Sequence, residues 1–170
     1  MIILGIGSNL PSTFGDRFKN IILAISYLET QGIKILKKSS FYETPSYPDS
    51  EKPKFINIVA LVETHLPPVD LMSVLVFIEE KLERKRNKKN DPRTCDIDII
   101  DYNGQVANFN YKNLDVTLPH GKAANRNFVL IPLNEIIPEW KHPKTNETID
   151  VLISKLSKTD KNSILKIKKP

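Results

Sequence analysis

The order of hydrophobic periodicities along the chain restricts its fold more than any other sequence feature. Short apolar or β-branched runs predict four strands, at residues 2–6, 33–44, 55–64 and 96–102. Apolar residues with helical spacing predict two helices, at residues 14–28 and 69–84. Strand, helix, strand, strand, helix, strand is the ferredoxin-like order. It predicts an α+β fold in which an antiparallel sheet is flanked by helices as an αβα sandwich.

Proline, glycine and asparagine mark the connections between these elements. Two prolines among polar residues predict a loop over 44–53, and a basic run predicts another over 84–92. Asn103-Gly104 is a two-residue hairpin signal, so the strand before it should return through 105–109. Two further helices are expected, at 125–136 and 149–156.

Composition limits the class of protein. The 170 residues are 40% apolar and 26% charged, which suits one packed domain. The single cysteine, Cys95, excludes an intrachain disulfide and fits a reducing, cytoplasmic location, and we expect it to be a small buried filler. No segment is long and apolar enough to span a bilayer, so no membrane partner is expected.

The formal net charge of +5 has two interpretations. A basic protein suits anionic partners such as phosphates, nucleotides or nucleic acid. The excess can equally serve solubility alone, because much of it lies between Lys155 and Lys169.

The most informative stretch is the strand that begins at Asp96. Side chains alternate along a strand, so Asp96 and Asp98 should point to the same face, with Cβ atoms roughly 6–7 Å apart. Two carboxylates on one face suit Mg²⁺, which completes its shell with water and substrate phosphates. An isolated Asp-x-Asp is more often a solvated pair. Aspartate is disfavoured in strands, however, so two in an otherwise apolar strand need a reason.

A basic run lies directly upstream of these carboxylates. It comprises Arg84, Lys85, Arg86, Lys88, Lys89 and Arg93. Arginine grips phosphate oxygens in a bidentate manner, and phosphoryl transfer depends mainly on positioning and charge neutralisation. The alternatives are a solvated turn and binding of a nucleic-acid backbone.

His120 is a candidate phosphate ligand or acid–base group. The three histidines lack close metal-ligand spacing, which argues against a zinc site. Residues 5–10 are glycine-rich but lack the Gly-Lys-Ser/Thr of a Walker loop, so ATP would have to be held by arginine, histidine and metal.

Two phenylalanines and an amide form a candidate binding site for a flat ring. Phe55 and Asn57 share one face of their strand, and Phe128 follows Arg126 by two residues. Aromatic faces can sandwich a heterocycle while an amide binds its edge, although phenylalanine is more often a core residue.

Taken together, five motifs resemble those of the 6-hydroxymethyl-7,8-dihydropterin pyrophosphokinases of folate biosynthesis, with matching order and spacing from about Ile3 to Trp140. They are Gly7-Ser8-Asn9-Leu10, Ser39-Ser40-Phe41-Tyr42-Glu43-Thr44-Pro45, Phe55-Ile56-Asn57, Pro92-Arg93-Thr94-Cys95-Asp96-Ile97-Asp98, and Pro119-His120 with Asn125-Arg126-Asn127-Phe128. The resemblance implies one pyrophosphokinase domain over 1–160 and a basic tail over 161–170.

The resemblance also implies roles for individual residues. Asp96 and Asp98 would hold two Mg²⁺ ions between ATP and the pterin alcohol. The pterin would stack between Phe55 and Phe128, with its edge bound by Asn57 and by the Thr44–Pro45 backbone. Residues expected to line the ATP site are Glu79, Arg84, Arg93, Thr117, His120 and Arg126. Those expected to act in catalysis are Arg84, Arg93, Asp96, Asp98 and His120.

In the family reaction, the pterin hydroxyl attacks the β-phosphorus of ATP and AMP departs, while loops at about 46–54 and 84–92 close over the nucleotide. The resemblance further implies a possible fusion to, or cooperation with, dihydropteroate synthase. It implies no nucleic-acid partner.

The chain departs from the family pattern at three places. Asn90-Asp91 stands where many members have Trp-Gly, Asp115 where some have arginine, and Gly121 where an aromatic residue is common. From these changes we expect altered ATP affinity with the chemistry retained. Two alternatives to the pyrophosphokinase are a ferredoxin-like RNA-binding module and a catalytically inactive scaffold of the same fold.

Overall fold

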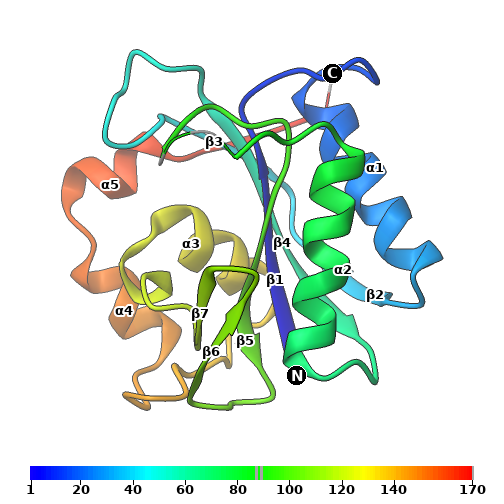
Figure 1. The fold of residues 1–170 in the computed structure, drawn as a ribbon. Helices are drawn as coiled ribbons and strands as arrows, with labels where there is room; N and C mark the ends of the chain where they lie inside the picture. Colours follow the sequence, from blue (N-terminus) through cyan, green and yellow to red (C-terminus); the bar gives the residue numbers. More distant parts are fainter. Residues whose placement is uncertain (87, 89, 170) are drawn as a thin grey trace.

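The computed structural model describes residues 1–86, 88 and 90–169 of the chain. Its strands are β1 (Ile2–Ser8), β2 (Lys34–Lys38), β3 (Phe41–Thr44), β4 (Phe55–Glu63), β5 (Asp96–Tyr102), β6 (Ala107–Tyr111), β7 (Leu114–Leu118) and β8 (Leu165–Ile167). Its helices are α1 (Arg17–Thr30), α2 (Pro68–Lys81), the short 3₁₀ turn η1 (Ala123–Asn125), α3 (Asn127–Ile136), α4 (Ile149–Lys155) and α5 (Lys158–Ser163). Figure 1 shows the main sheet between two layers of helices.

The main sheet is antiparallel and has the strand order β5-β1-β4-β3-β8, with β2 also paired to β4. Strands β1 and β5, the first and last of the βαββαβ order, pair with each other. Strand β1 lies in the interior of the sheet and β5 lies at its edge. This arrangement confirms the predicted α+β fold, an antiparallel sheet flanked by helices.

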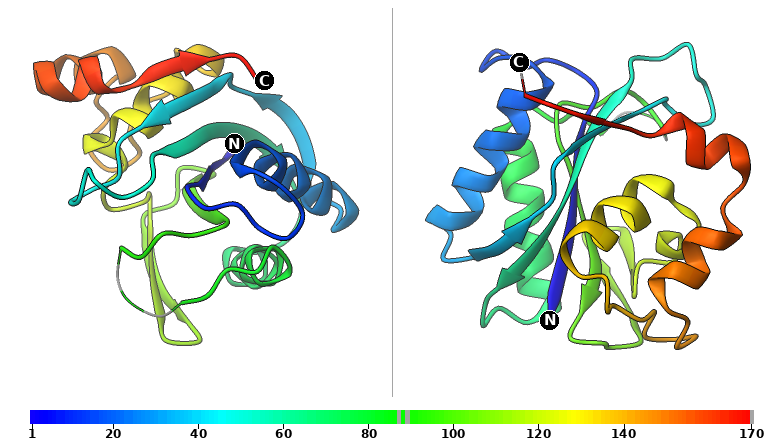
Figure 2. Two further views of the ribbon diagram at one scale, coloured as in Figure 1. Left: turned by 90° about the horizontal axis from the view of Figure 1, so that it is seen from above. Right: turned by 180° about the vertical axis from the view of Figure 1, so that it is seen from behind.

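Each face of the sheet carries its own hydrophobic core, because side chains alternate along the strands. Leu4 and Ile6 of β1 pack with α1 and α2, whereas Ile3 packs with α3 and α4. The views in Figure 2 show α1 and α2 on one side of the sheet and α3, α4 and α5 on the other. None of the helices within the described residues is long and apolar enough to cross a membrane.

The strand predicted over 33–44 is two strands. The break lies at Ser39, whose N–H donates to the carbonyl of Val59 at 2.9 Å and whose Oγ accepts from the N–H of Val59 at 3.0 Å. Because the Ser39 side chain takes over one backbone hydrogen bond, β2 and β3 both pair with β4 but do not continue into one another.

The hairpin predicted at Asn103-Gly104 is only partly correct. The turn forms, with both residues at positive φ and the N–H of Gln105 donating to the carbonyl of Tyr102. The following strand, β6, then pairs with β7 and not with β5. Strand β7 was not predicted, although the alternation of Leu114, Val116 and Leu118 is a pattern typical of a strand.

The C-terminal residues also take part in the fold. Within the segment expected as a basic tail, 161–170, residues 161–163 complete helix α5 and residues 165–167 form strand β8, while Pro170 lies outside the described residues. Strand β8 pairs antiparallel with β3, so it forms an edge of the main sheet.

Candidate active site

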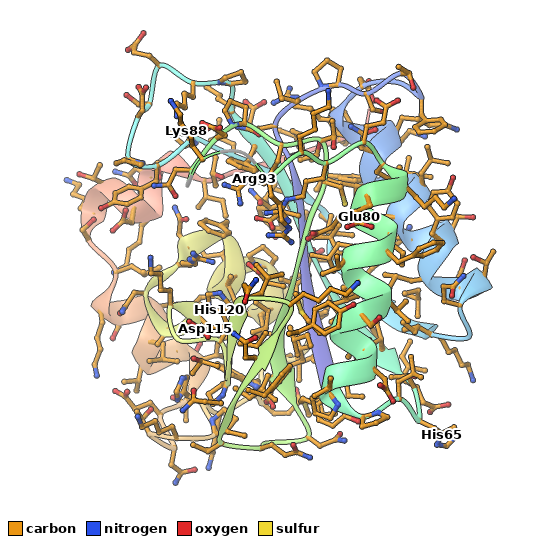
Figure 3. All side chains as sticks on the ribbon, viewed as in Figure 1. His65, Glu80, Lys88, Arg93, Asp115 and His120 are labelled. Atoms are coloured by element: carbon orange, nitrogen blue, oxygen red, sulfur yellow. The ribbon has the colours of Figure 1, made fainter. Side chains whose placement is uncertain are left out.

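One cavity brings together all the residues expected on the nucleotide side. It has a volume of about 400 Å³ and lies beside β5, between α2, β7 and the start of α3. Eight expected residues line it, namely Glu79, Arg84, Arg93, Asp96, Asp98, Thr117, His120 and Arg126. Figure 3 shows His120 and Asp115 close together in front of the sheet, with Arg93 above them.

The two aspartates lie on the same face of β5, as the strand alternation predicts. Ile97 and Ile99 point into the opposite core and are 1% and 3% exposed. The side chains of Asp96 and Asp98 are 23% and 39% exposed, so both carboxylates can be reached from the cavity.

Asp96 is paired with two arginines from the preceding loop. Its Oδ1 lies 2.7 Å from Nη1 of Arg84, and its Oδ2 lies 2.8 Å from Nη1 of Arg93. Burial alone would raise the pKa of Asp96, but the two guanidinium groups outweigh it and hold this pKa below its usual range. Asp96 is therefore an ionised carboxylate between two cations.

Asp98 has looser partners and keeps more uncompensated negative charge. Its Oδ2 lies 3.5 Å from Nη1 of Arg126 and 3.7 Å from Nε2 of His120. Burial, and then the charge of Asp96, raise the pKa of Asp98 despite these neighbours. Burial lowers the pKa of His120, and Asp98 opposes this shift. The carboxylate pair thus lacks a closely held positive charge on its Asp98 side.

Glu79 of α2 is buried and pairs with two arginines of the basic run. Its side chain is 2% exposed, and its two oxygens lie 2.5 Å from Arg84 Nη1 and 2.5 Å from Arg86 Nη2. Oε1 also accepts the backbone N–H of Ile97 at 2.8 Å. Burial is the main cause that raises the pKa of Glu79 to about 7, against the effect of both arginines. Glu79 therefore orients the arginines from below, and also fastens α2 to β5.

The donor set fits a magnesium–nucleotide complex better than a metal bound by protein alone. Within the described residues there is no group of three or more His, Cys, Asp or Glu side chains that could cage an ion. Mg²⁺ is usually bound by one or two carboxylates together with substrate phosphates, and Asp96 and Asp98 supply two such carboxylates. The surrounding arginines are suited to those phosphates.

Glycines in β1 keep the neighbouring surface open. Gly5 and Gly7 pair with Asp98 and Asp96 across the sheet. A Cβ at Gly7 would lie 2.8 Å from Oδ1 of Asn57, which is too close for an unstrained contact. The backbone of β1 can therefore approach the Asn57 side chain only because residue 7 has no side chain.

The residues expected to bind the pterin lie outside the 400 Å³ cavity, on the neighbouring strands β3 and β4 and at the start of α3. Nδ2 of Asn57 donates to Oγ1 of Thr44 at 3.0 Å, which fixes the amide orientation. The guanidinium of Arg93 lies 5.8 Å from the ring centroid of Phe55, and that of Arg126 lies 5.3 Å from the ring of Phe128. Pro45 follows Thr44 at the end of β3 and is exposed.

Each phenylalanine is thus contacted by an arginine that also pairs with one of the two aspartates. This contact links the ring-binding residues to the carboxylate pair.

Asn9 joins the bases of the two loops beside the site, a role that the sequence did not reveal. Its Nδ2 donates to the carbonyl of Pro53 at 3.0 Å and to Ser46 Oγ at 3.2 Å. Its Oδ1 accepts the N–H of Arg93 at 2.7 Å. In the sequence, Asn9 stands in the turn after β1 and in the motif Gly7-Ser8-Asn9-Leu10, and neither indicates these contacts.

The cavity wall also contains residues that the sequence reading did not single out. They include Met72, Leu114, Val116 and Lys122. The apolar side chains of Met72, Leu114 and Val116 suit the flat face of a base, and the last two belong to the unpredicted strand β7.

Two of the three departures from the family pattern lie in the wall of the cavity, and the third lies in the loop before Arg93. Asp115 and Gly121 both line the cavity. Asn90 has φ 64°, and its carbonyl accepts from Nζ of Lys52 at 3.1 Å, which connects the two loops. Cys95, which is fully buried, confirms its expected role as a filler, and burial raises its pKa well above the usual range.

Comparisons with known proteins agree with this geometry. Residues 3–138 match the family model described as 7,8-dihydro-6-hydroxymethylpterin-pyrophosphokinase (HPPK). The chain is 36% identical over 138 residues to the 2-amino-4-hydroxy-6-hydroxymethyldihydropteridine pyrophosphokinase of Methylorubrum extorquens, a match that covers 80% of this chain and 82% of that protein. It is 34% identical over 154 residues to a folic acid synthesis protein of Schizosaccharomyces pombe, covering 90% of this chain.

Several relatives are much longer than this chain. The match spans only 20% of the Schizosaccharomyces pombe protein and 21% of the corresponding Dictyostelium discoideum protein. Among solved structures, the HPPK-DHPS protein of Plasmodium falciparum superposes with a TM-score of 0.69 at 18% identity, covering 91% of this chain and 44% of that one. That likeness concerns the fold.

Proposed function

The chain belongs to the 7,8-dihydro-6-hydroxymethylpterin-pyrophosphokinase family, and on this premise we propose that it transfers the pyrophosphoryl group of ATP to 6-hydroxymethyl-7,8-dihydropterin. The products would be the pterin diphosphate and AMP. The observation that carries the proposal is the pair Asp96 and Asp98, which faces one cavity together with Arg84, Arg93 and Arg126.

The arrangement of charges suits transfer of a highly anionic group. Three arginines and His120 surround the carboxylate pair within a cavity large enough for a nucleotide. Such transfer depends on positioning and on charges fixed in advance, and needs little covalent chemistry from the protein. Asp96 and Asp98 are the residues that would hold two Mg²⁺ ions, and bound Mg²⁺ would neutralise the phosphate oxygens.

The protein side chains then have separate roles in this proposal. Arg84 and Arg93 would turn from Asp96 toward the phosphates, because a phosphate offers the same bidentate geometry as a carboxylate. His120 and Arg126 would hold the opposite side of the same phosphate chain, near Asp98. Glu79 would support the arginines and make no direct contact with the phosphates, because it lies beneath Arg84 and Arg86 and is almost fully buried.

The pterin would lie next to this cavity, between Phe55 and Phe128. Its amide edge would face Asn57 and the Thr44–Pro45 backbone, where Thr44 already orients Asn57. Its hydroxyl oxygen would attack the β-phosphorus as the bond from that phosphorus to the AMP oxygen breaks, and the hydroxyl proton would be released to water. To admit the ring, Arg93 and Arg126 must leave the two phenylalanines.

An assay of the nucleotide product tests the proposal. The protein is incubated with ATP, MgCl₂ and 6-hydroxymethyl-7,8-dihydropterin, and nucleotides are separated by chromatography. We expect AMP in a one-to-one ratio with the pterin diphosphate, and no AMP when the pterin is omitted. ADP as the main product, or equal AMP without pterin, would exclude pyrophosphoryl transfer.

The family relationship disfavours the RNA-binding alternative, and the charge of the sheet agrees. The open face of β5 presents two carboxylates, which would repel a nucleic-acid backbone unless a cation lay between them. We therefore propose small-molecule substrates only.

We also propose that this protein is fused to, or works beside, dihydropteroate synthase. Two comparisons support this: a relative in Pisum sativum is named a bifunctional folate synthesis protein, and the Plasmodium structure carries the name HPPK-DHPS. Copurification of synthase activity with this chain from its source would test the proposal.

A further inference from the structure

We propose that the C-terminal segment 157–167, here called the C-terminal strap, sets the distance between the two walls of the pterin subsite and so determines the affinity for the pterin. The inference rests on the proposed function for the identity of the substrate. The strap consists of α5 and β8 and lies outside residues 3–138, which match the family model. Its central contact is made by Asn127, to which we assign a positioning role.

The strap is fastened to the first turn of α3. Nδ2 of Asn127 donates to the carbonyl of Asp160 at 2.7 Å and to Oγ of Ser163 at 3.1 Å. Asn127 is 8% exposed, and it lies between Arg126 and Phe128. A buried amide with two partners of good geometry holds its backbone closely, because an unmade hydrogen bond there carries the full desolvation cost. The strap therefore restrains the turn that carries Phe128.

The same strap is fastened to β3, the strand that leads to Thr44 and Pro45. Leu165 lies opposite Glu43, the residue before Thr44, and Ile167 lies opposite Phe41. Only Ile164 separates Leu165 from Ser163, the residue that contacts Asn127. Figure 2 shows this connection running from the outer edge of the sheet to α5 beside α3. The junction 163–165 thus joins the Phe128 side of the subsite to the Thr44 side.

The two ends of α3 are held to β3 by different groups. At its C-terminal end, Glu135 accepts hydrogen bonds directly from Ser40 and from the hydroxyl of Tyr42. The strap adds only an exposed contact there, from Nζ of Lys166 to Glu135 at 3.2 Å. At its N-terminal end, the contact with β3 runs through Asn127 and the strap. Phe128 lies at this second end, so its distance from Thr44 and Asn57 depends on the strap.

The nucleotide side has further contacts that do not involve the strap. No residue of the strap lines the 400 Å³ cavity within the described part of the chain. The N–H of Arg126 donates to the carbonyl of Ala123, and its side chain faces Asp98. A loosened strap should therefore change binding of the pterin far more than binding of ATP.

Kinetics of full-length variants test the inference. Asn127→Ala removes both contacts to the strap, and we expect the KM for the pterin to rise at least tenfold while the KM for ATP and kcat stay within about threefold. Ser163→Ala removes one of the two contacts and should raise the pterin KM by a smaller factor. Thr148→Ala is the matched control: it removes a helix cap from α4 nearby, where Thr148 Oγ1 accepts the N–H of Val151, and should leave both KM values unchanged.

The outcomes separate this inference from the proposed function. Absence of AMP formation by the unmodified protein would remove the proposed function, and the inference with it. Normal AMP formation together with a pterin KM within twofold in Asn127→Ala, or equal rises in both KM values, would overturn the inference alone. Should Asn127→Ala fail to fold by circular dichroism, the same ratio of KM values in Ser163→Ala decides the question.

Discussion

The indole N–H of Trp140 donates a hydrogen bond of 2.8 Å to Oδ2 of Asp101, 39 residues earlier in the chain. Both residues are 3% exposed, and Oδ1 of Asp101 accepts the N–H of Gly104 at 2.8 Å. This contact fastens the loop after α3 to the end of β5 that lies opposite Asp96. A structural carboxylate and the two candidate metal-binding carboxylates thus occur on one strand, and their partners distinguish them.

Trp140→Phe should test the structural role of this carboxylate. The substitution leaves Asp101 buried and short of one hydrogen bond, so the free energy of unfolding should fall by about 2 kcal/mol. Urea denaturation followed by circular dichroism measures it. The rate of AMP formation at 25 °C should stay near that of the unmodified protein, because neither residue lines the cavity. A loss below about 0.5 kcal/mol would argue against this role.

Asp96→Ala and Asp98→Ala should each abolish measurable turnover, a reduction of at least about 100-fold. The phosphate charge would then face a single carboxylate with its cation missing. Pterin binding without nucleotide, followed by fluorescence, should change much less. Asp150→Ala in the exposed first turn of α4 is the control and should keep full activity. Near-normal turnover in either site variant would remove the two-metal hypothesis.

Gly7→Ala should destabilise the protein, because the added Cβ would lie 2.8 Å from Asn57 Oδ1. Overpacking of this kind costs about 1–3 kcal/mol, measured as the free energy of unfolding. Gly121→Ala is the comparison, since no atom lies within 4 Å of a Cβ there, and its stability should be nearly unchanged. Equal stability of the two variants would show that β1 can shift to accept a side chain at residue 7.

Asn90→Trp should change the affinity for ATP, because an aromatic residue at this position is common in the family. Asn90 has φ 64°, a conformation that asparagine tolerates better than tryptophan. Asn90→Ala is therefore the matched control, since it brings similar backbone strain without a ring. ATP titration by calorimetry compares the two. Identical affinities in both variants would indicate that the missing aromatic residue has no effect on nucleotide binding.

Glu135 should make stability depend on pH. Partial burial alone would raise its pKa, but hydrogen bonds from Ser40 and Tyr42 outweigh this and hold the pKa of Glu135 below its usual range. A carboxyl with a lower pKa in the folded state stabilises the protein above its unfolded pKa, and this contribution is lost as the pH falls through the folded pKa.

Glu135→Gln should consequently lower the free energy of unfolding by roughly 1 kcal/mol at pH 7, a modest value because the carboxylate is partly solvated. The difference from the unmodified protein should shrink as the pH falls from about 5 to about 3. Urea denaturation at these pH values measures it. A difference that grows toward low pH would contradict the assignment.

Much of the fold and of the proposed nucleotide-binding side of the site could be predicted from local sequence patterns. The four strands and two helices of the βαββαβ order have hydrophobic periods that depend only on nearby residues. The common orientation of Asp96 and Asp98 follows from the pleat of a single strand. The wrong predictions concern which strands pair with one another. Asn103-Gly104 specifies a turn, but whether the next strand returns along β5 or pairs with β7 depends on competing partners elsewhere in the chain.

By itself, the sequence therefore determined the βαββαβ order of the first elements, the face that carries the carboxylate pair and the identity of the basic groups beside it. Only the tertiary structure decided which cations contact which carboxylate, that Glu79 lies buried beneath Arg84 and Arg86, and that the C-terminal segment joins α3 to β3. The physical reason is the distance along the chain over which each kind of interaction acts. Backbone geometry sets side-chain direction over a few residues, whereas these contacts connect residues far apart in the chain and form only when both sheet faces have packed.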